Sequence, residues 1–192
     1  MQTSLQTRRL ILRPFSQNDA PRLAWLAGDY DVARMCARLP HPYPIAAAFD
    51  FLEHLAAGRQ ARNEFAFALT APIDGLIGAC GIERAGDETS RTWELGYWLG
   101  LRYWGAGYAS EAAGAVMNWA REQLGAARFT GAHFTDNPAS GRVLRRLGFR
   151  PAGDEDRFSL ARQQTSPAIR YVWPDGAEPA KPDTRGNAGL LH

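Results

Sequence analysis

Residues Arg102–Ser110 read RYWGAGYAS, with two glycines set between bulky aromatic side chains. Apolar residues then recur at three- and four-residue steps from Ala109 to Leu124, and Gly125 follows, which predicts a helix that ends at this glycine. The two glycines therefore precede a helix N-terminus, where unpaired N–H groups and the positive end of the helix dipole favour an anion. Phosphate is the natural ligand of such a loop, although a simple packing turn would also explain the glycines.

The familiar phosphate-binding loops do not fit this stretch. A P-loop requires the pattern GxxxxGK[ST], and no lysine is present here. A dinucleotide-binding loop requires GxGxxG, but Ser110 occupies the position of the third glycine. The glycines thus indicate another type of anion site, and the flanking sequence has to decide which.

The order of the flanking elements predicts the fold class. Alternating apolar residues bounded by Gly, Pro and Asp predict strands, and a periodicity of three to four residues predicts helices. Strands are expected at 8–15, 64–70, 76–84, 91–101, 128–134, from 149 onward and at 168–173, and helices at 18–27, 45–57, 109–124 and 137–147. Because three strands follow one another before the long helix, we expect a mixed α+β sheet of about seven strands and not an alternating doubly wound fold.

Length, charge and cysteine content set further bounds. A chain of 192 residues with a net charge of +2 is expected to form one domain, and this charge is too small to indicate a nucleic-acid partner. Cys36 and Cys80 form no CxxC pair and the histidines lack metal-ligand spacing, so we expect reduced thiols, a cytoplasmic location and no metal. Neither a signal peptide nor an apolar run of membrane-spanning length is present, so no membrane association is expected.

Three blocks of sequence resemble a known family: RRLILRP at 8–14, TWELGYWLG at 92–100 and NPASGRVLRRLGF at 137–149. In this order and at these separations they resemble the GNAT acetyltransferases, and more narrowly the RimJ/RimL-like group of ribosomal-protein N-terminal acetyltransferases. The resemblance extends from Thr7 to Trp173. It implies a GNAT domain over 7–173, with a mixed, mostly antiparallel, twisted sheet flanked by helices, and a disordered tail over 174–192.

The resemblance implies acetyl-CoA as the ligand of the glycine loop, with its pyrophosphate at Arg102–Ala109. Glycine lacks a Cβ, so the backbone can approach the phosphates closely, and an arginine adds a charged hydrogen bond. The residues expected to bind acetyl-CoA are Leu99, Leu101, Arg102, Trp104, Gly105, Ala106, Gly107, Tyr108, Ala109, Asn137 and Arg142. Arg142 belongs to a group with Arg145, Arg146 and Arg150. Three interpretations of this group stay open: a solvated helix face, a site for the CoA phosphates, or a contact with nucleic acid.

Acetyl transfer to an amine requires a base, because an amine is mostly protonated at pH 7. Glu94 is the leading candidate, because strand alternation places it on the face opposite Trp93 and Tyr97, and a mid-strand carboxylate among aromatic residues is unusual. Burial there would raise its pKa toward a useful value. A structural ion pair with an arginine across the sheet, for example Arg84 or Arg91, is the alternative.

The departing thiolate requires a proton. Many GNAT enzymes supply it from a tyrosine seven residues after the asparagine of the short helix, but this chain has Leu144 at that position. By resemblance, Asn137 contacts the amide arm of the cofactor, in addition to the N-cap role that its position predicts. Ser140 is the candidate proton donor, and protonation by solvent or by the product ammonium is the competing route. Some Rim-type enzymes also carry an acidic residue where this chain has Ser159.

Together these features predict an acetyl-CoA-dependent N-acetyltransferase that moves the acetyl group directly to a primary amine. The acceptor is either a protein N-terminus or a small amine, and the resemblance implies that Trp25, Tyr30, His41 and Tyr43 form one wall of its site. Two other functions stay open: a non-catalytic acyl-CoA-binding or regulatory module, and an RNA- or ribosome-binding protein. An exposed sheet edge could also support a homodimer.

Overall fold

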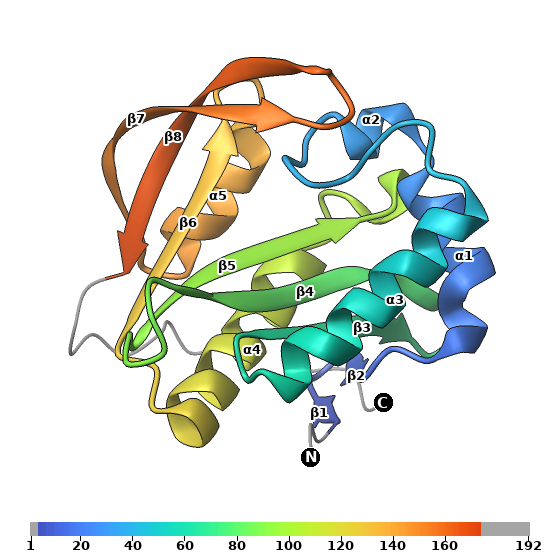
Figure 1. Ribbon diagram of the computed structural model, residues 1–192, viewed down its shortest axis with the longest axis horizontal. Helices are drawn as coiled ribbons and strands as arrows, with labels where there is room; N and C mark the ends of the chain where they lie inside the picture. Colours follow the sequence, from blue (N-terminus) through green and yellow to red (C-terminus); the bar gives the residue numbers. More distant parts are fainter. Residues whose placement is uncertain (1–3, 174–192) are drawn as a thin grey trace, which may run out of the picture.

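A twisted sheet of eight strands runs through the computed structural model, which describes residues 4–173 (Figure 1). The strands lie in the order β1-β2-β3-β4-β5-β6-β8-β7, and only the β5–β6 pair is parallel within this described sheet. Their bounds are β1 Leu5–Gln6, β2 Ile11–Arg13, β3 Glu64–Ala71, β4 Gly75–Ala85, β5 Thr92–Leu99, β6 Arg128–Phe134, β7 Arg150–Ser159 and β8 Gln164–Trp173. The predicted α+β class with a mixed, mostly antiparallel sheet is confirmed. The tail expected at 174–192 lies outside the described residues.

The first predicted strand is shorter than expected. Within residues 8–15 only Ile11–Arg13 pairs with β3, and the two-residue strand β1 precedes it. A turn separates the two strands, because the Thr7 N–H and hydroxyl donate to the Leu10 carbonyl oxygen at 2.9 and 3.1 Å. The strand β1 before this turn lies outside the predicted range, which accounts for eight strands where about seven were expected.

Helices cover both faces of the sheet. In Figure 1, α3 (Ile45–Gln60) lies in front of the sheet beside α1 (Ala20–Ala27), and α4 (Tyr108–Leu124) and α5 (Pro138–Arg146) lie behind it. The short 3-10 helix η1 (Gln17–Asp19) precedes α1, and a second one, η2 (Leu101–Tyr103), precedes the loop that leads into α4. The sequence did not predict α2 (Tyr30–Ala33), because four residues are too few to show a helical periodicity.

Aromatic side chains join the start of β5 to α4. Trp93 is completely buried, and the ring of Phe65 lies 5.9 Å from Trp93 and 5.2 Å from Trp119, measured between centroids. Phe67 contacts Trp119 edge-on at 5.1 Å. Such ring pairs stabilise by about 0.5–1.5 kcal/mol each beyond the burial of their area. The cluster therefore fixes the strand that carries Glu94.

β5 and β6 separate after a short parallel contact. Thr92–Glu94 pair with Arg128–Thr130, and beyond these residues the two strands diverge while β6 stays paired with β8 (Figure 1). Gly96, in the middle of β5, is exposed as a result. The divergence opens the sheet between its two halves, and this opening positions the site described next.

Candidate active site

The predicted phosphate loop adopts the backbone that its glycines allow. Gly105 and Gly107 have φ angles of +76° and +80°, in the region that favours glycine, and Gly107 is the N-cap of α4. A Cβ built on Gly105 would meet no atom within 4 Å, so the space beside it is open. The first N–H groups of this 17-residue helix have no partners within the helix, and the loop is therefore suited to hold an anion.

An arginine from the N-terminal segment clamps this loop. Arg9 Nη1 donates to the Ala106 carbonyl oxygen at 2.8 Å, and its guanidinium carbon lies 4.5 Å from the centre of the Tyr108 ring. Glu111 in turn fixes Arg9, because its carboxylate accepts from the Arg9 N–H and Nε and from the Thr7 hydroxyl at 2.7–2.8 Å. Glu111 itself is visible in the sequence as an acidic residue in the first turn of the predicted helix, where the helix dipole favours a carboxylate.

Glu111→Gln is expected to destabilise the protein by about 1–3 kcal/mol at pH 7, because a charged acceptor of three hydrogen bonds becomes neutral. Partial burial raises the pKa of Glu111, but the hydrogen bonds from Thr7 and Arg9 lower it by more, so it lies below its ordinary 4.5. A lowered folded-state pKa gives stability above the ordinary value that is lost as the pH falls through the folded value. Urea denaturation should show a wild-type advantage at pH 7 that shrinks well below pH 4.5. A constant advantage would contradict the role of this charge.

Two cavities meet where β5 and β6 diverge. The narrow cavity has a volume of about 130 Å³ and lies between the phosphate loop and the start of α5. The wide cavity has a volume of about 530 Å³ and lies between the sheet, α3 and residues 35–40. The residues that line both, and so mark their junction, are Met35, Cys36, Tyr97 and Trp98.

The structure brings much of the predicted acetyl-CoA set to the narrow cavity. Its lining includes Leu99, Trp104, Gly105, Ala109 and Asn137. Trp104 Nε1 donates to the Leu99 carbonyl oxygen at 2.7 Å, which joins the end of β5 to the loop. The other predicted residues are not in this lining. Leu101 and Arg102 lie in η2, Ala106 and Gly107 lie in the loop, and Tyr108 begins α4. Arg142 is exposed on α5.

Glu94 lines the wide cavity, and its burial is only partial. The side chain is 34% exposed, and Oε1 accepts from Arg157 Nη1 at 2.5 Å, while Arg157 Nε contacts Glu155. Glu94 therefore does form an ion pair with an arginine, as the alternative expected, but neither example is the partner, because Arg84 and Arg91 donate to backbone carbonyl groups. The sequence could not identify Arg157, because β7 reaches Glu94 only through the tertiary packing of the second half of the sheet.

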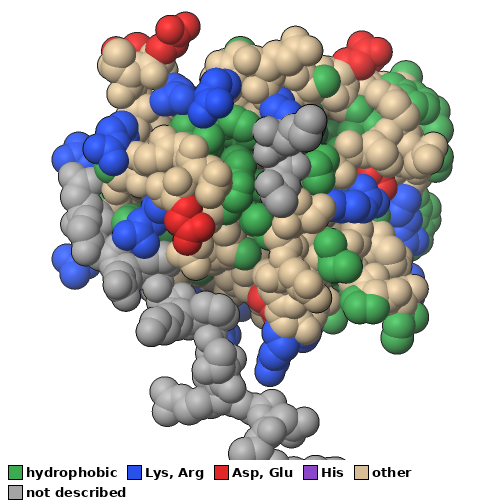
Figure 2. Space-filling view, turned by 90° about the horizontal axis from the view of Figure 1, so that it is seen from below, with side chains coloured by type: hydrophobic (Ala, Val, Ile, Leu, Met, Phe, Trp, Pro, Cys, Tyr) green, Lys and Arg blue, Asp and Glu red, His purple; other side chains and the backbone are tan. Residues whose placement is uncertain are grey.

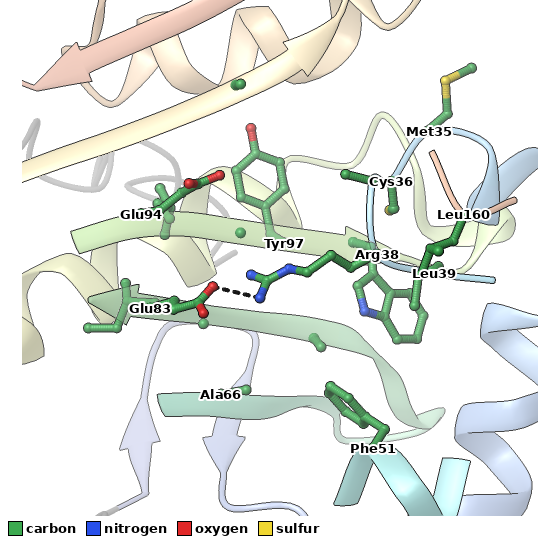
Figure 3. A pocket seen from close by; sticks show the side chains of 18 of the residues that line it. Met35, Cys36, Arg38, Leu39, Phe51, Ala66, Glu83, Glu94, Tyr97 and Leu160 are labelled. Carbon is green, nitrogen blue, oxygen red and sulfur yellow. Dashed lines mark hydrogen bonds and ion pairs between the residues drawn. The ribbon is translucent and has the colours of Figure 1, made fainter. Parts of the chain in front are cut away.

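Three glutamates lie next to one another on the floor of the wide cavity. Glu64 is opposite Glu83 across β3 and β4, and Glu83 is opposite Glu94 across β4 and β5. Like charges in this arrangement repel one another. Each glutamate has a basic neighbour within 2.8 Å: His54 pairs with Glu64, Arg38 with Glu83 and Arg157 with Glu94. Figure 3 shows Arg38 extending along the cavity to Glu83, while Glu94 points into the opening above it.

The first turn of α5 brings a hydroxyl to the narrow cavity. Asn137 is confirmed as the N-cap, because its Oδ1 accepts from the Ser140 N–H at 3.2 Å. The Ser140 hydroxyl lies 2.9 Å from Tyr97 Oη, and Leu144 is buried in the core. Sequence reasoning missed Tyr97, because strand alternation groups it with the buried Trp93.

The β7–β8 turn holds residues 34–40, here called the roof segment, which border the wide cavity. Leu160 and Arg162 donate to backbone carbonyl groups of the roof segment at 3.0 and 2.7 Å. The completely buried Ser159 donates from its hydroxyl to the Cys36 carbonyl oxygen at 3.3 Å. Position 159, where some Rim-type enzymes carry an acid, therefore secures the roof segment in this protein.

The predicted aromatic wall of the acceptor site is divided. Tyr43 lines the wide cavity. Trp25, by contrast, is 60% exposed with Arg22 stacked on its ring, and Tyr30 contacts His41 edge-on. Tyr43 is therefore the member of this group that lines the wide cavity.

The arginines of α5 and the start of β7 lie at the surface. Arg142, Arg146 and Arg150 are exposed, and the likewise exposed Arg145 donates to Tyr171 Oη at 2.6 Å. On the face seen in Figure 2, basic side chains stand in separate groups with apolar and uncharged side chains between them. A solvated helix face describes the α5 arginines well, and their contact with CoA phosphates or nucleic acid stays a prediction.

Two negative findings hold for residues 4–173. Within this range, no group of three or more His, Cys, Asp or Glu side chains is arranged to hold a metal ion. No helix in the same range has both the length and the apolar character needed to cross a membrane.

Comparison with known proteins agrees with this geometry. The model of the acetyltransferase (GNAT) domain family matches residues 9–150. YoaA of Bacillus subtilis (strain 168), described as an uncharacterized N-acetyltransferase, is 30% identical over 150 residues, which cover 78% of this chain and 84% of YoaA. These two matches place the protein among the acyltransferases. The chain belongs to the GNAT acetyltransferase family, and it is an acetyl-CoA-dependent acyltransferase.

Solved structures show the same fold at low identity. The ribosomal-protein-S5-alanine acetyltransferase of Vibrio fischeri has a TM-score of 0.79 at 18% identity, with 94% of this chain and 100% of that chain covered. RimL, a ribosomal L7/L12 alpha-N-protein acetyltransferase solved with coenzyme A, has a TM-score of 0.78 at 18% identity, with 88% and 97% covered. These likenesses establish the shared fold, and the acceptor has to be argued from the cavity itself.

Proposed function

We propose that this protein transfers the acetyl group of acetyl-CoA directly to a primary amine, with acetyl-CoA in the narrow cavity and the amine in the wide one. The observation that carries this proposal is the junction of the two cavities at Tyr97 and Trp98, because it lets a thioester from one side meet an amine from the other. RimL, which shares the fold, was solved with coenzyme A.

The residues of the narrow cavity fit acetyl-CoA. The amides after Gly105 and the dipole of α4 suit the pyrophosphate, and Arg102 beside them adds a positive charge. From Leu99 back to Glu94, β5 spans about 17 Å at roughly 3.3 Å per residue, which is comparable to an extended pantetheine arm. Such an arm would run along the edge of β5 that faces the opening.

In the proposed reaction Glu94 is the general base. It takes a proton from the incoming ammonium, directly or through one water, and the neutral amine attacks the thioester carbon. The C–N bond forms, the C–S bond breaks, and the electron pair of that bond stays on sulfur. The ion pair with Arg157 fixes the Glu94 carboxylate at the wall of the wide cavity.

A compact amine fits the wide cavity better than the N-terminus of a folded protein. The roof segment borders this cavity and is held by three hydrogen bonds from the β7–β8 turn. The cavity walls are largely apolar, with Leu39, Phe51 and Ile82 among them. The three glutamates on its floor are each paired with one basic side chain, and their carboxylates keep oxygen lone pairs that can accept from an ammonium group. We therefore favour a small primary amine with an apolar body as the acceptor, and a protein N-terminus is the second candidate.

A thermal-shift titration tests the cofactor assignment first. A ligand at 100 times its dissociation constant stabilises by about 2.7 kcal/mol, which raises the melting temperature of a protein of this size by roughly 5–11 °C. We expect this shift with acetyl-CoA and not with AMP or NAD. An absent shift would remove the proposal.

An acceptor panel then separates the acceptor classes. Small alkyl and aromatic primary amines are compared with peptides that carry a free N-terminus, and CoA release is measured. Faster release with the small amines is expected. Release with peptides alone would select the second candidate, and binding of acetyl-CoA without release for any acceptor would favour the non-catalytic module.

A further inference from the structure

Tyr97 and Ser140 form a pair of hydroxyl groups at the junction of the two cavities. Tyr97 Oη lies 2.9 Å from Ser140 Oγ and donates to the Ser140 carbonyl oxygen at 3.1 Å. Tyr97 comes from β5 and Ser140 from the first turn of α5, so the pair also bridges the two sides of the opening. Tyr97 lines both cavities, and Ser140 lines the narrow one.

Either oxygen of the 2.9 Å contact can be the donor, and one of the two arrangements makes a hydroxyl proton of this pair available to a ligand. When the phenol donates toward the two oxygens of Ser140, the serine hydroxyl hydrogen is free to point away from Tyr97. Burial raises the pKa of Tyr97 above its ordinary value of 10, so the phenol stays a neutral donor throughout the physiological range. The serine hydroxyl is then held as a donor toward the narrow cavity.

We infer that Tyr97 is a positioning residue that aims the Ser140 hydroxyl at the sulfur of the departing CoA, and that this hydroxyl stabilises the thiolate by a hydrogen bond. The inference rests on the proposed function, because it assigns the sulfur to the junction of the two cavities. It gives this chain a donor for the leaving group although Leu144 carries no hydroxyl.

The step balances without a net proton from either hydroxyl. As the C–S bond breaks, its electron pair stays on sulfur, and Ser140 Oγ–H donates to the thiolate. A free thiol has a pKa of about 8.5, which is lower than that of a serine or a buried tyrosine, so a complete transfer from these groups would be uphill. After attack the nitrogen must lose a second proton, which passes through water to the thiolate, and Glu94 returns the first proton of the ammonium to solvent. CoA and the amide then leave in their neutral forms.

The ratio of the affinities for CoA and for desulfo-CoA, which lacks the sulfur, measures this hydrogen bond. The measurement needs no amine substrate. Calorimetry at pH 9 is suitable, because the ionised fraction of the thiol is much larger there than at pH 7, while burial keeps the Tyr97 phenol protonated. We expect wild type to prefer CoA by roughly tenfold, the effect of one hydrogen bond to a charged group. Tyr97→Phe should bind desulfo-CoA within about twofold of wild type and lose most of the preference for CoA.

Further variants distinguish positioning from packing. Ser140→Ala should lose the same preference, and Tyr97→Phe combined with Ser140→Ala should lose no more than Ser140→Ala alone, because Tyr97 acts through Ser140. Tyr171→Phe removes a phenol that contacts Arg145 and serves as the matched control with an unchanged preference.

The outcomes separate this inference from the proposed function. A full preference for CoA in Tyr97→Phe, or an equal loss of affinity for both ligands, would overturn the inference and leave the proposed function intact. Failure of wild type to bind either ligand would overturn both. A preference lost in Tyr97→Phe and Ser140→Ala but kept in Tyr171→Phe would establish the pair.

Discussion

Glu94→Gln is expected to lower kcat for acetyl transfer by about 100-fold or more at pH 7, the range that general base catalysis supplies. Glutamine keeps the shape of the side chain and can still accept from Arg157 Nη1, but it cannot take a proton from the amine. The KM for acetyl-CoA should stay within about twofold, because Glu94 lines the wide cavity and not the narrow one. The loss should decrease at higher pH, where more of the amine is already neutral.

Glu83→Gln is the matched control for this variant. Glu83 lies directly opposite Glu94 on the floor of the same cavity, and its side chain is held by Arg38. The control should raise the KM for a cationic acceptor while kcat changes little. Steady-state rates from pH 6 to 9 with one amine would check both variants. An unchanged kcat in Glu94→Gln would exclude this carboxylate as the base, and a weaker affinity for acetyl-CoA would assign it a structural role.

Gly107→Val is expected to weaken acetyl-CoA binding by about ten- to a hundredfold. A β-branched residue at a φ of +80° is strained by about 1–3 kcal/mol, and a shift of the loop to relieve that strain would misplace the first N–H groups of α4. A Cβ at this position would also lie 3.4 Å from the Arg9 guanidinium and so disturb the clamp. Calorimetry with acetyl-CoA measures the loss directly.

Gly75→Val separates backbone strain from ligand binding. Gly75 has a φ of +66° at the start of β4, and a Cβ there would meet no atom within 4 Å. This control should lose stability by a similar strain and keep wild-type affinity for acetyl-CoA. Wild-type affinity in Gly107→Val as well would mean that the phosphates bind elsewhere.

The donor side of the site could be predicted from the sequence because it is local. The glycines, the N-terminus of α4 and the end of β5 are consecutive in the chain, so their pattern alone indicates an anion site before a helix. The Asn137 cap was predictable for the same reason. The clamp by Arg9 was not, because it joins residues 97 positions apart.

The acceptor side depends on tertiary packing that no local pattern encodes. The row of three glutamates appears only when β3, β4 and β5 are in register. The partner of Glu94 lies 63 residues away on β7. Tyr97 was grouped with core residues because alternation along β5 places it on the same face of the sheet as the buried Trp93. Alternation reports only which face a side chain takes. It does not report that the sheet opens at that point.

The roof segment and the phosphate loop are secured by different parts of the chain, and this has an evolutionary consequence. The loop depends on Arg9 and Glu111, whereas the roof segment depends on the β7–β8 turn through Ser159 and its neighbours. Mutations in the turn can therefore reshape the space for the amine without touching the contacts that hold the loop. Descendants of such a chain can acquire new acceptors through changes in one hairpin while they inherit the same acyl donor.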